Sequence, residues 1–546
     1  MPDPSQWWCS AVVYQIYPRS FADSDGDGIG DLGGIAERLD YLQQLGVDVL
    51  WLSPIYPSPH DDNGYDISDY RDVDPAFGTL EQFDQLLRDV HARGMKLVMD
   101  VVVNHTSDEH PWFVESRSSR DNPKRDWYWW RDEPNNWTSE FSGPAWELDD
   151  KTGQYYLHLF TRKQPDLNWE NPEVREAVYE MMRWWLDRGV DGFRMDVINF
   201  ISKPADLHDD ATDTRGPIGR DAYICGPRIH EFLHEMHEQV FAGRDGLLTV
   251  GEMPGVTVEE AQLFTDPARG EVDMVFQFEH FNIDQRKNKW DWFPLHLPDL
   301  KHSLGRWQEG LAETGWNALY WNNHDTPRSV SHWGDDGEHR VAAAKLLGTV
   351  LHLHRGTPYV YQGEELGMTN VPFESIEDFR DIESLSHYAE ATAAGQEPEE
   401  VLRGLRWMSR DNARTPVQWD ASEHAGFTTG EPWIPVNANH TEINAEAGLA
   451  DPDSVFHHYR KLIAFRHEEP AVAEGDFTML LPDGERVYAF TRRHGDTELL
   501  VIANFSADAV TPDADREWAG AEVVIGDPGD SLALGPWEAR VYRRSR

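Results

Sequence analysis

The stretch GFRMDVINF, residues 192–200, places two charged side chains inside an apolar run. Arg194 and Asp196 are two positions apart, so both side chains leave the same face of a β-strand. On a buried sheet face such a pair is costly, because the attraction between the ions only partly returns the hydration that both lose. We therefore expect the pair to lie at a strand end, in a site that uses it.

Other short, β-rich apolar runs alternate with helical patterns along the chain. With residues 189–196 they make eight candidate strands: 11–18, 47–54, 96–105, 189–196, 247–253, 274–278, 318–325 and 357–365. Amphipathic segments between them place Ile35, Leu39, Leu42 and Leu45 on one helical face, and Phe83, Leu86, Leu87 and Val90 on another. Asn171 and Pro172 are typical of the start of a helix, here one that ends at Gly189. Eight such units predict a closed parallel (β/α)8 barrel of the α/β class, with its active site at the carboxyl ends of the strands.

The remaining length falls in two places. Residues 106–171 are polar and rich in tryptophan, as in DWYWWRDEPNNW, and are too long for a plain loop. They predict an inserted subdomain after the third strand. Residues 474–546 contain short strands separated by Gly, Asp and Pro turns, which predict a C-terminal antiparallel β domain. The barrel is then built from 1–105 and 172–473.

Composition limits the function classes. The 546 residues carry a net charge of −48, which repels phosphate backbones and anionic lipid surfaces, so we expect no nucleic acid or membrane partner. A neutral small molecule is indifferent to that field. The two cysteines, Cys9 and Cys225, form no disulfide framework, the N-terminus lacks the pattern of a signal peptide, and no apolar run is long enough for a membrane span. These features favour a cytoplasmic protein, either a monomer or a weak homo-oligomer.

Charged residues gather at the ends of the candidate strands. They are Asp100, His105, Arg194, Asp196, Glu252, His324 and Asp325. A single acid at such a place commonly caps a helix or anchors a loop. Asp196, Glu252 and Asp325 together are different, because three crowded carboxylates repel one another and destabilise a site that has no task. They are our candidate catalytic residues, and we expect Asp100 to brace the site.

Displacement at an acetal carbon is a reaction that needs such a group. Retaining glycoside hydrolysis uses two carboxyl groups about 5 Å apart, one ionised as the nucleophile and one protonated as the acid. Their pKa values must therefore differ. We expect the positive charge of Arg194 to favour ionised Asp196, and the surrounding acids in a desolvated pocket to keep the proton on Glu252.

Several segments also resemble a known family. DVVVNH, GFRMDVINF, TVGEMPG and YWNNHD resemble the four signature segments of the α-amylase family, and QPDLN (164–168) is similar to its fifth. The resemblance covers essentially the whole chain and is greatest to bacterial oligo-1,6-glucosidases and dextran glucosidases. It implies a retaining, exo-acting α-glucosidase that prefers α-1,6 linkages, as in isomaltose, isomalto-oligosaccharides and panose. It further implies that Asp196 is the nucleophile, Glu252 the acid/base, and Asp325 the carboxylate that steadies the distorted sugar.

The resemblance also implies a set of substrate-binding residues. These are Asp62, Tyr65, His105, Gln164, Arg194, Val197, His324 and Arg414. Valine directly after the nucleophile accompanies α-1,6 preference in relatives. Ordinary strand packing is the alternative for Val197, core packing for Tyr65, and a helix-terminal ion pair for Arg414.

DSDGDGIGD, residues 23–31, reproduces the early spacing of an EF-hand loop. Gly34 stands where that loop needs a bidentate glutamate, so the segment is not an EF-hand. Relatives bind calcium at a similar loop, which implies a structural Ca2+, with Mg2+ as the alternative ion. The expected ligands are Asp23, Asp25, Asp27, Ile29 and Asp31. A solvated acidic turn is the competing interpretation, and no organic cofactor or catalytic zinc is expected.

Two other function classes stay open. The first is a glucosyl transferase or sucrose isomerase, in which a sugar intercepts the glucosyl-enzyme. Sucrose isomerases carry an Arg-Leu-Asp-Arg-Asp run after the sixth strand, where this chain reads HFNIDQRKNKW. The second is a non-catalytic binding module, which the complete set of acids disfavours.

Overall fold

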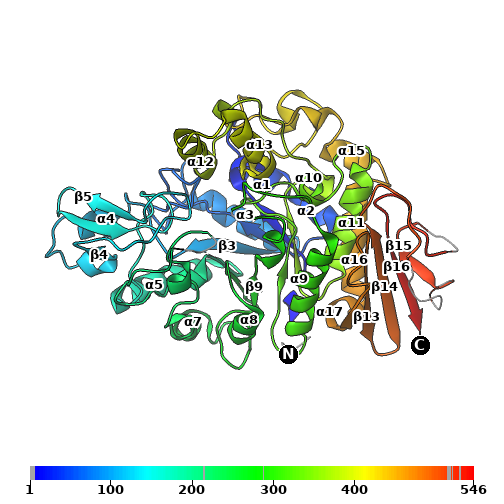
Figure 1. Ribbon diagram of the computed structural model, residues 1–546, viewed down its shortest axis with the longest axis horizontal. Coiled ribbons are helices and arrows are strands. Elements are labelled where there is room, and N and C mark those ends of the chain that lie inside the picture. Colours follow the sequence, from blue (N-terminus) through cyan, green and yellow to red (C-terminus); the bar gives the residue numbers. More distant parts are fainter. Residues whose placement is uncertain are drawn as a thin grey trace.

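The computed structural model describes residues 6–212, 216–286, 288–512, 518, 520–527 and 531–545 (Figure 1). Residues 1–5 and 546, which the predicted domain boundaries include, lie outside this part. Eight parallel strands form the central sheet in the order β10-β11-β1-β2-β3-β7-β8-β9. They are β1 (Val13–Ile16), β2 (Val49–Leu52), β3 (Lys96–Val102), β7 (Gly192–Asp196), β8 (Leu248–Glu252), β9 (Met274–Phe276), β10 (Ala318–Leu319) and β11 (Thr357–Tyr361). A parallel bridge between Val275 and Asn317 joins the two ends of this order, so the predicted barrel is confirmed.

Helices surround the barrel, and their boundaries follow local sequence signals. Helix α3 (Leu80–Ala92) begins with a capping box between Thr79 and Gln82, and its predicted apolar face is buried. Helix α5 (Pro172–Arg188) starts where Asn171 accepts a hydrogen bond from the Glu173 amide. It ends at Gly189, whose φ of 111° suits glycine. The segment predicted as one helix through Ile35 and Leu45 is two, α1 (Leu32–Glu37) and α2 (Leu39–Leu45), because Arg38 leaves the helical conformation.

The other helices complete this layer and the loops around it. They are α4 (Pro111–Ser116), α6 (Arg220–Tyr223), α7 (Ile229–Met236), α8 (Val258–Phe264), α9 (Leu297–Gly310), α10 (Ser329–Trp333), α11 (Arg340–His352), α12 (Ile382–Ala393), α13 (Pro398–Met408), α14 (Asp411–Arg414), α15 (Ala445–Ala450), α16 (Val455–Glu468) and α17 (Pro470–Glu474). In the described part of the chain, none of them is both long and apolar enough to cross a membrane.

The inserted subdomain follows β3 in the chain. Its antiparallel sheet has the order β4-β6-β5, formed by β4 (Trp130–Arg131), β5 (Trp146–Asp149) and β6 (Gln154–Leu157). Trp129, Trp137 and Trp146 are buried in a cluster with Phe200, which follows β7. These three tryptophans therefore build a core that also packs on the barrel.

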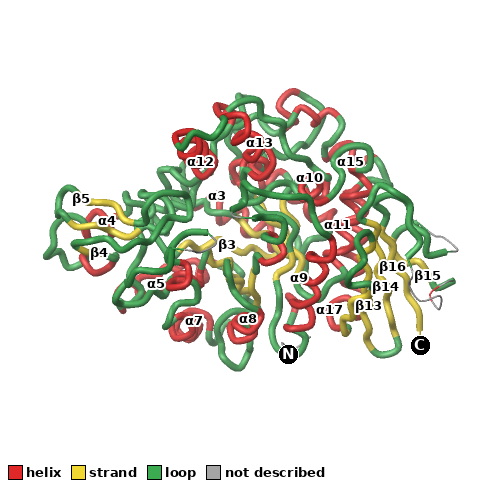
Figure 2. The backbone as a smooth tube through the Cα atoms, in the orientation of Figure 1, coloured by secondary structure: helices red, strands yellow, loops and turns green. Residues whose placement is uncertain are grey.

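The C-terminal β domain lies at the opposite end of the molecule from the inserted subdomain (Figure 2). Its sheet has the order β12-β13-β14-β16-β15 and contains β12 (Asp476–Leu480), β13 (Val487–His494), β14 (Thr497–Asn504), β15 (Glu522–Ile525) and β16 (Ala539–Ser545). Neighbouring strands are antiparallel. Phe490 and Leu499 share a buried cluster with Leu346 and Val350 of α11, so the domain is joined to the barrel through an apolar interface.

Candidate active site

A pocket of about 940 Å³ opens at the carboxyl ends of the barrel strands. Asp196 is the last residue of β7, Glu252 is the last residue of β8, and Asp325 follows β10. All three line this pocket, together with Asp62, Tyr65, His105, Val197, Phe141, Phe160 and Arg410. The barrel thus brings together the three acids that the sequence singled out.

Arg194 lies below the acids and binds three carboxyl groups. It is the register partner of Asp100 on β3, and its Nη1 donates to Asp100 Oδ1 at 2.9 Å and to Asp196 Oδ1 at 2.6 Å. Its Nη2 lies 2.8 Å from Glu252 Oε1. Asp100 also accepts from the hydroxyl of Tyr65, so it braces both the arginine and the pocket wall. One guanidinium therefore holds the two candidate reacting carboxyls near each other.

The pKa values of the two acids differ from the sequence-based expectation. Burial raises the pKa of Glu252 to about 7 and that of Asp196 also to about 7, while Arg194 acts to lower both. The expected separation is absent because the arginine contacts both carboxyls rather than Asp196 alone. Because Arg194 contacts both carboxyls, its charge alone does not favour ionisation of Asp196 over ionisation of Glu252.

The raised pKa values of these two carboxyls predict a bell-shaped dependence of kcat/KM on pH. The pair is active with one proton bound, so activity falls as pH drops below about 7, when a second proton binds, and falls again above it, when the last proton leaves. The contribution of these two carboxyls to the free energy of unfolding decreases as pH rises. Carboxyl pKa values raised by folding favour the folded state below the unfolded pKa of about 4, and this contribution is lost as pH rises through about 7. Initial rates and melting temperatures measured across this range test both statements. A kcat/KM that stays level through neutral pH would contradict the first.

Asp325, by contrast, is held in its ionised state. Burial opposes its charge, but His324, Arg410 and Arg414 outweigh burial and keep the pKa of Asp325 well below its usual range. Arg414 Nη2 donates to Asp325 Oδ1 at 2.8 Å, and Arg410 Nη1 donates to the same oxygen at 3.2 Å. Asp325 is thus a fixed negative charge in the pocket.

An ion pair closes the far wall of the pocket. Arg410 Nη2 lies 3.0 Å from Asp62 Oδ1 and 2.5 Å from Asp381 Oδ1, and all three side chains are buried. Its guanidinium also lies 4.7 Å from the ring centre of Phe141, which belongs to the inserted subdomain. The same side chain therefore joins the barrel loops to the inserted subdomain at the Asp62 side of the pocket.

The predicted binding residues fall into two groups. Asp62, Tyr65, His105 and Val197 line the pocket. Gln164, His324, Arg194 and Arg414 lie behind that surface: Gln164 Nε2 donates to Asp62 Oδ2 at 3.1 Å, and the His324 ring stacks on Tyr65 at 4.9 Å. Their hydrogen bonds and ring contacts hold the residues that line the pocket in place.

Sequence reasoning missed Arg410, Asp381 and Phe141. Arg410 is the first arginine of RDNAR, the motif from which Arg414 was selected. Both arginines reach Asp325, because four residues of helix α14 bring positions 410 and 414 to one face. That spacing was a usable signal. Asp381 and Phe141 come from loops that are distant in the sequence, and no sequence signal marked them as site residues.

Val197 has an unusual backbone. Its φ is 34° and its ψ is 42°, a left-handed conformation that a β-branched residue rarely adopts. In this position its amide donates to Glu252 Oε2 at 2.9 Å. The bend therefore aims a backbone donor at the candidate acid/base, which fits the rule that such strain is found at functional sites.

A second buried ion pair supports the base of the pocket. Lys203 Nζ lies 2.7 Å from Asp166 Oδ2 and donates to Asn104 Oδ1 at 2.7 Å, and the side chains of Lys203 and Asp166 are fully buried. Asn104 precedes His105 and also donates to Asp166. The pair joins the segment after β7 to the inserted subdomain at QPDLN.

Replacing Lys203 with Met is expected to lower the free energy of unfolding by about 3–5 kcal/mol, because it leaves the Asp166 carboxylate buried without its charge partner. Urea denaturation measures the change. The double variant K203M/D166N removes both charges and should recover much of the loss. Equal stability of K203M and the unaltered protein would contradict a structural role for the pair.

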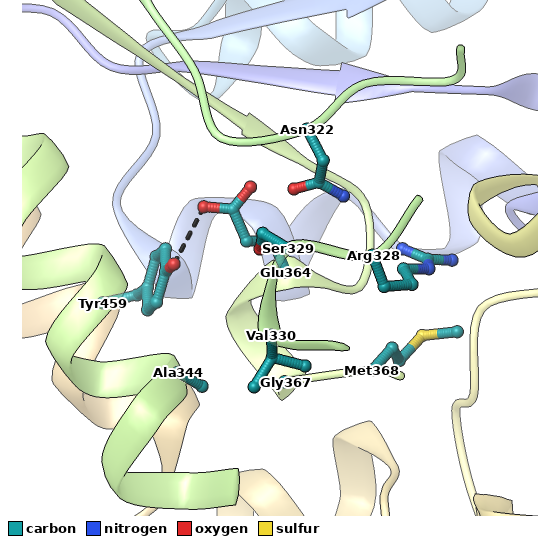
Figure 3. A pocket seen from close by; sticks show the side chains of 9 residues that line it. All are labelled: Asn322, Arg328, Ser329, Val330, Ala344, Glu364, Gly367, Met368 and Tyr459. Atoms are coloured by element: carbon teal, nitrogen blue, oxygen red, sulfur yellow. Dashed lines mark hydrogen bonds between the residues drawn. The ribbon is translucent and has the colours of Figure 1, made fainter. Parts of the chain in front are cut away.

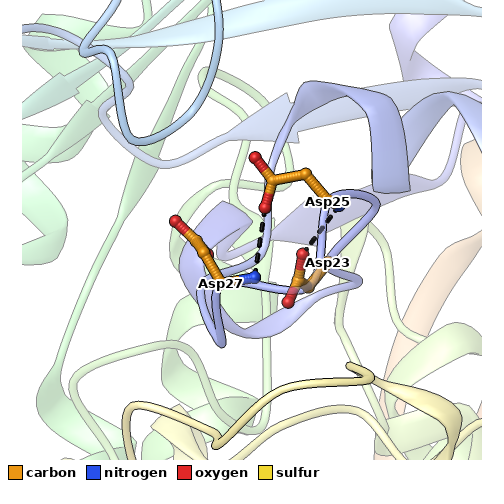
Figure 4. A group of neighbouring side chains, drawn as sticks. All are labelled: Asp23, Asp25 and Asp27. Carbon is orange, nitrogen blue, oxygen red and sulfur yellow. Dashed lines mark hydrogen bonds between the residues drawn. The ribbon is translucent and has the colours of Figure 1, made fainter.

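The acidic loop is drawn in Figure 4, and its residues do not line this pocket. Carboxylate oxygens of Asp23, Asp25 and Asp27 lie within 4.8 Å of one another, as ligands of one cation would. The Asp31 side chain also caps α1 by accepting from the Gly34 amide. Burial and the charges of Asp25, Asp23 and Asp31 raise the pKa of Asp27, and a cation would relieve that repulsion.

Comparison with known proteins gives consistent results. The family description "Alpha amylase, catalytic domain" matches residues 15–475. The chain is 56% identical to the oligo-1,6-glucosidase of Parageobacillus thermoglucosidasius, over 98% of this chain and 99% of that protein. The crystal structure of Bacillus licheniformis trehalose-6-phosphate hydrolase superposes with a TM-score of 0.94 at 48% identity, covering 99% of this chain and 100% of the other. Isomaltulose synthase from Klebsiella sp. LX3 gives a TM-score of 0.95 at 44% identity, covering 98% and 99%.

Proposed function

This chain belongs to the α-amylase family, and from that premise we propose that it is a retaining, exo-acting α-glucosidase. It releases glucose from the non-reducing end of short α-glucosides and prefers α-1,6 linkages. The observation that carries the proposal is the binding of Asp196 and Glu252 to one guanidinium in a pocket that Asp325 also lines. This arrangement supports the close carboxyl spacing, about 5 Å, that retention requires.

The proposed reaction has two steps. The Asp196 carboxylate attacks the anomeric carbon, the glycosidic bond breaks, and the proton of Glu252 passes to the leaving oxygen. Water then gives a proton to ionised Glu252 and attacks the same carbon, which releases Asp196 and α-glucose. Asp325, kept ionised by the two arginines, favours the positive charge that develops on the sugar ring. Arg194 contacts both carboxyls that react.

Exo action and linkage preference rest on the pocket walls. The Asp62–Arg410 pair at the far wall supports binding of a chain end rather than a chain interior. Preference for α-1,6 linkages is supported by the name of the relative at 56% identity and by Val197, which lines the pocket next to the candidate nucleophile. Side-chain bulk at that place changes the room for the second sugar.

Separate incubation with isomaltose, maltose, sucrose and trehalose, with products followed over time, tests the proposal. Isomaltose should give glucose fastest. Maltose cleaved much faster than isomaltose would contradict the role given to Val197. Conversion of sucrose to an isomer, instead of to glucose and fructose, would favour the isomerase alternative, as would transfer products at low sugar concentration.

We also propose that the acidic loop binds a structural Ca2+, with Mg2+ as the alternative ion, held by Asp23, Asp25, Asp27, Asp31 and the Ile29 carbonyl. The loop lies outside the catalytic pocket, so such an ion contributes stability and no chemistry. Added Ca2+ should raise the melting temperature by about 2–4 °C and a chelator should reverse the rise, because a ligand of the folded state stabilises it. The variant D25N/D27N should not respond. A full Ca2+ response in that variant would place the ion elsewhere.

We propose a cytoplasmic location and a monomeric or weakly associated state. Cys9 and Cys225 are both free thiols, which suits a reducing compartment.

A further inference from the structure

A small internal cavity of about 10 Å³ lies between the turn after β10 and the turn after β11 (Figure 3). Asn322, Arg328, Ser329, Val330, Glu364 and Tyr459 contribute to its wall. None of these six residues belongs to the lining of the active-site pocket. The cavity is thus a separate feature of the barrel interior.

Two buried polar side chains face this cavity with atoms that lack a partner. Asn322 is 2% exposed, and neither its Oδ1 nor its Nδ2 has a hydrogen-bond partner among the described residues. Glu364 is 5% exposed; its Oε1 accepts from the Tyr459 hydroxyl at 2.8 Å, while its Oε2 has no partner there. In Figure 3 the amide and the carboxyl point toward one another across the cavity. Buried polar atoms are almost always bonded to protein or to ordered water.

Size and charge indicate the kind of ligand. A volume of about 10 Å³ is close to the least that accommodates one ordered water molecule. The guanidinium of Arg328 is buried beside the cavity and bonded to the carbonyls of Gln362, Asn412 and Ala413, so its positive charge disfavours a cation. Burial raises the pKa of Glu364 to about 8, which leaves its carboxyl neutral at pH 7 and able to donate. The amide of Asn322 and the neutral carboxyl of Glu364 suit a neutral ligand that can both donate and accept hydrogen bonds.

We propose that this cavity is a binding site for one water molecule, which joins the Asn322 amide to Oε2 of Glu364. Asn322 directly precedes Asn323, whose Oδ1 accepts from the Asp325 amide at 2.8 Å. The water therefore fixes the root of the turn that carries Asp325 to the turn that follows β11. Asn322 and Glu364 are positioning residues, since both lie outside the pocket that takes the substrate.

A crystal structure of the full chain at high resolution tests the water site without reference to activity. We expect one isolated density peak between Asn322 and Glu364, about 2.7–3.2 Å from an atom of each, as hydrogen bonds require. A cavity without density, in a map that shows other buried waters, would overturn the proposal. So would a peak with the short distances and many ligands of a metal ion.

Two variants of Glu364 test the positioning role. Glu364→Gln keeps a neutral side chain that can bond the water, so it should retain the peak and most of the activity. Glu364→Met has a similar length but cannot form the bond; it should lose the peak and reduce kcat/KM by about tenfold, as small displacements of a catalytic group do. The pair is compared on whichever glucoside the unaltered protein hydrolyses, so a wrong substrate assignment does not affect the result. Equal kcat/KM for the two variants, both folded by circular dichroism, would refute the positioning role.

Discussion

Replacing Asp196 with Asn is expected to reduce kcat on isomaltose by about 10⁴-fold, because an amide oxygen does not form the glucosyl ester on which the retaining reaction depends. Asparagine has the shape of aspartate and can still accept from Arg194 Nη1, so the fold should persist. Glucose release measures the rate. Intact-protein mass spectrometry gives a second readout: a fluorinated glucoside that reacts quickly and hydrolyses slowly should add one sugar to the unaltered protein and none to D196N.

Asp273→Asn is the matched control. Asp273 precedes β9 at the amino end of the barrel, where its carboxyl accepts from Thr249, and burial raises its pKa to about 6. It is a comparable carboxylate that lies outside the pocket lining. D273N should therefore alter stability and leave turnover close to normal. Near-normal turnover in D196N, or a loss in D273N as deep as that in D196N, would contradict the role assigned to Asp196.

Replacing Glu252 with Gln should produce a loss that depends on the leaving group. On isomaltose, whose leaving alcohol needs a proton, kcat should fall by about 10³-fold, within the usual range for general acid catalysis. An aryl glucoside with a strongly acidic phenol needs no such proton, so formation of its glucosyl-enzyme should be nearly unaffected. The Gln side chain can still accept from the Val197 amide, which preserves the local geometry.

The second step offers an independent check on the same variant. Without a base at position 252 water reacts slowly, whereas azide is already an anion and needs none. Azide should accelerate E252Q on the aryl glucoside and yield glucosyl azide with the α configuration. The unaltered enzyme serves as the control and should be insensitive to azide. An equal loss on both leaving groups, without azide rescue, would show that Glu252 does not carry the proton.

The barrel was predictable because its signals are local. Each strand is a short, mostly apolar run, as expected where helices cover a parallel sheet, and the charged residues at the strand ends stand out within it. Asn171 and Gly189 likewise mark the two ends of α5 by their own conformational preferences. The break at Arg38 between α1 and α2 was not predictable, because the apolar period continues through it and both halves bury their faces.

The candidate site was predictable only in part. The three acids are predicted by their positions at strand ends and by the order of the segments that contain them. The sharing of Arg194 by Asp196 and Glu252 depends on strand tilt and side-chain reach, which no sequence spacing reports. The expected separation of their pKa values therefore did not appear. Arg410 and Asp381 meet only because distant loops converge on the barrel mouth.

The left-handed backbone at Val197 couples two properties that enzyme engineers treat as independent. Its side chain borders the room for the leaving sugar, while its amide is bonded to Glu252. A substitution that removes the left-handed backbone conformation at position 197 would redirect the amide and also change the shape of the pocket beside it. Attempts to retune linkage selectivity at this position should therefore be accompanied by changes in turnover.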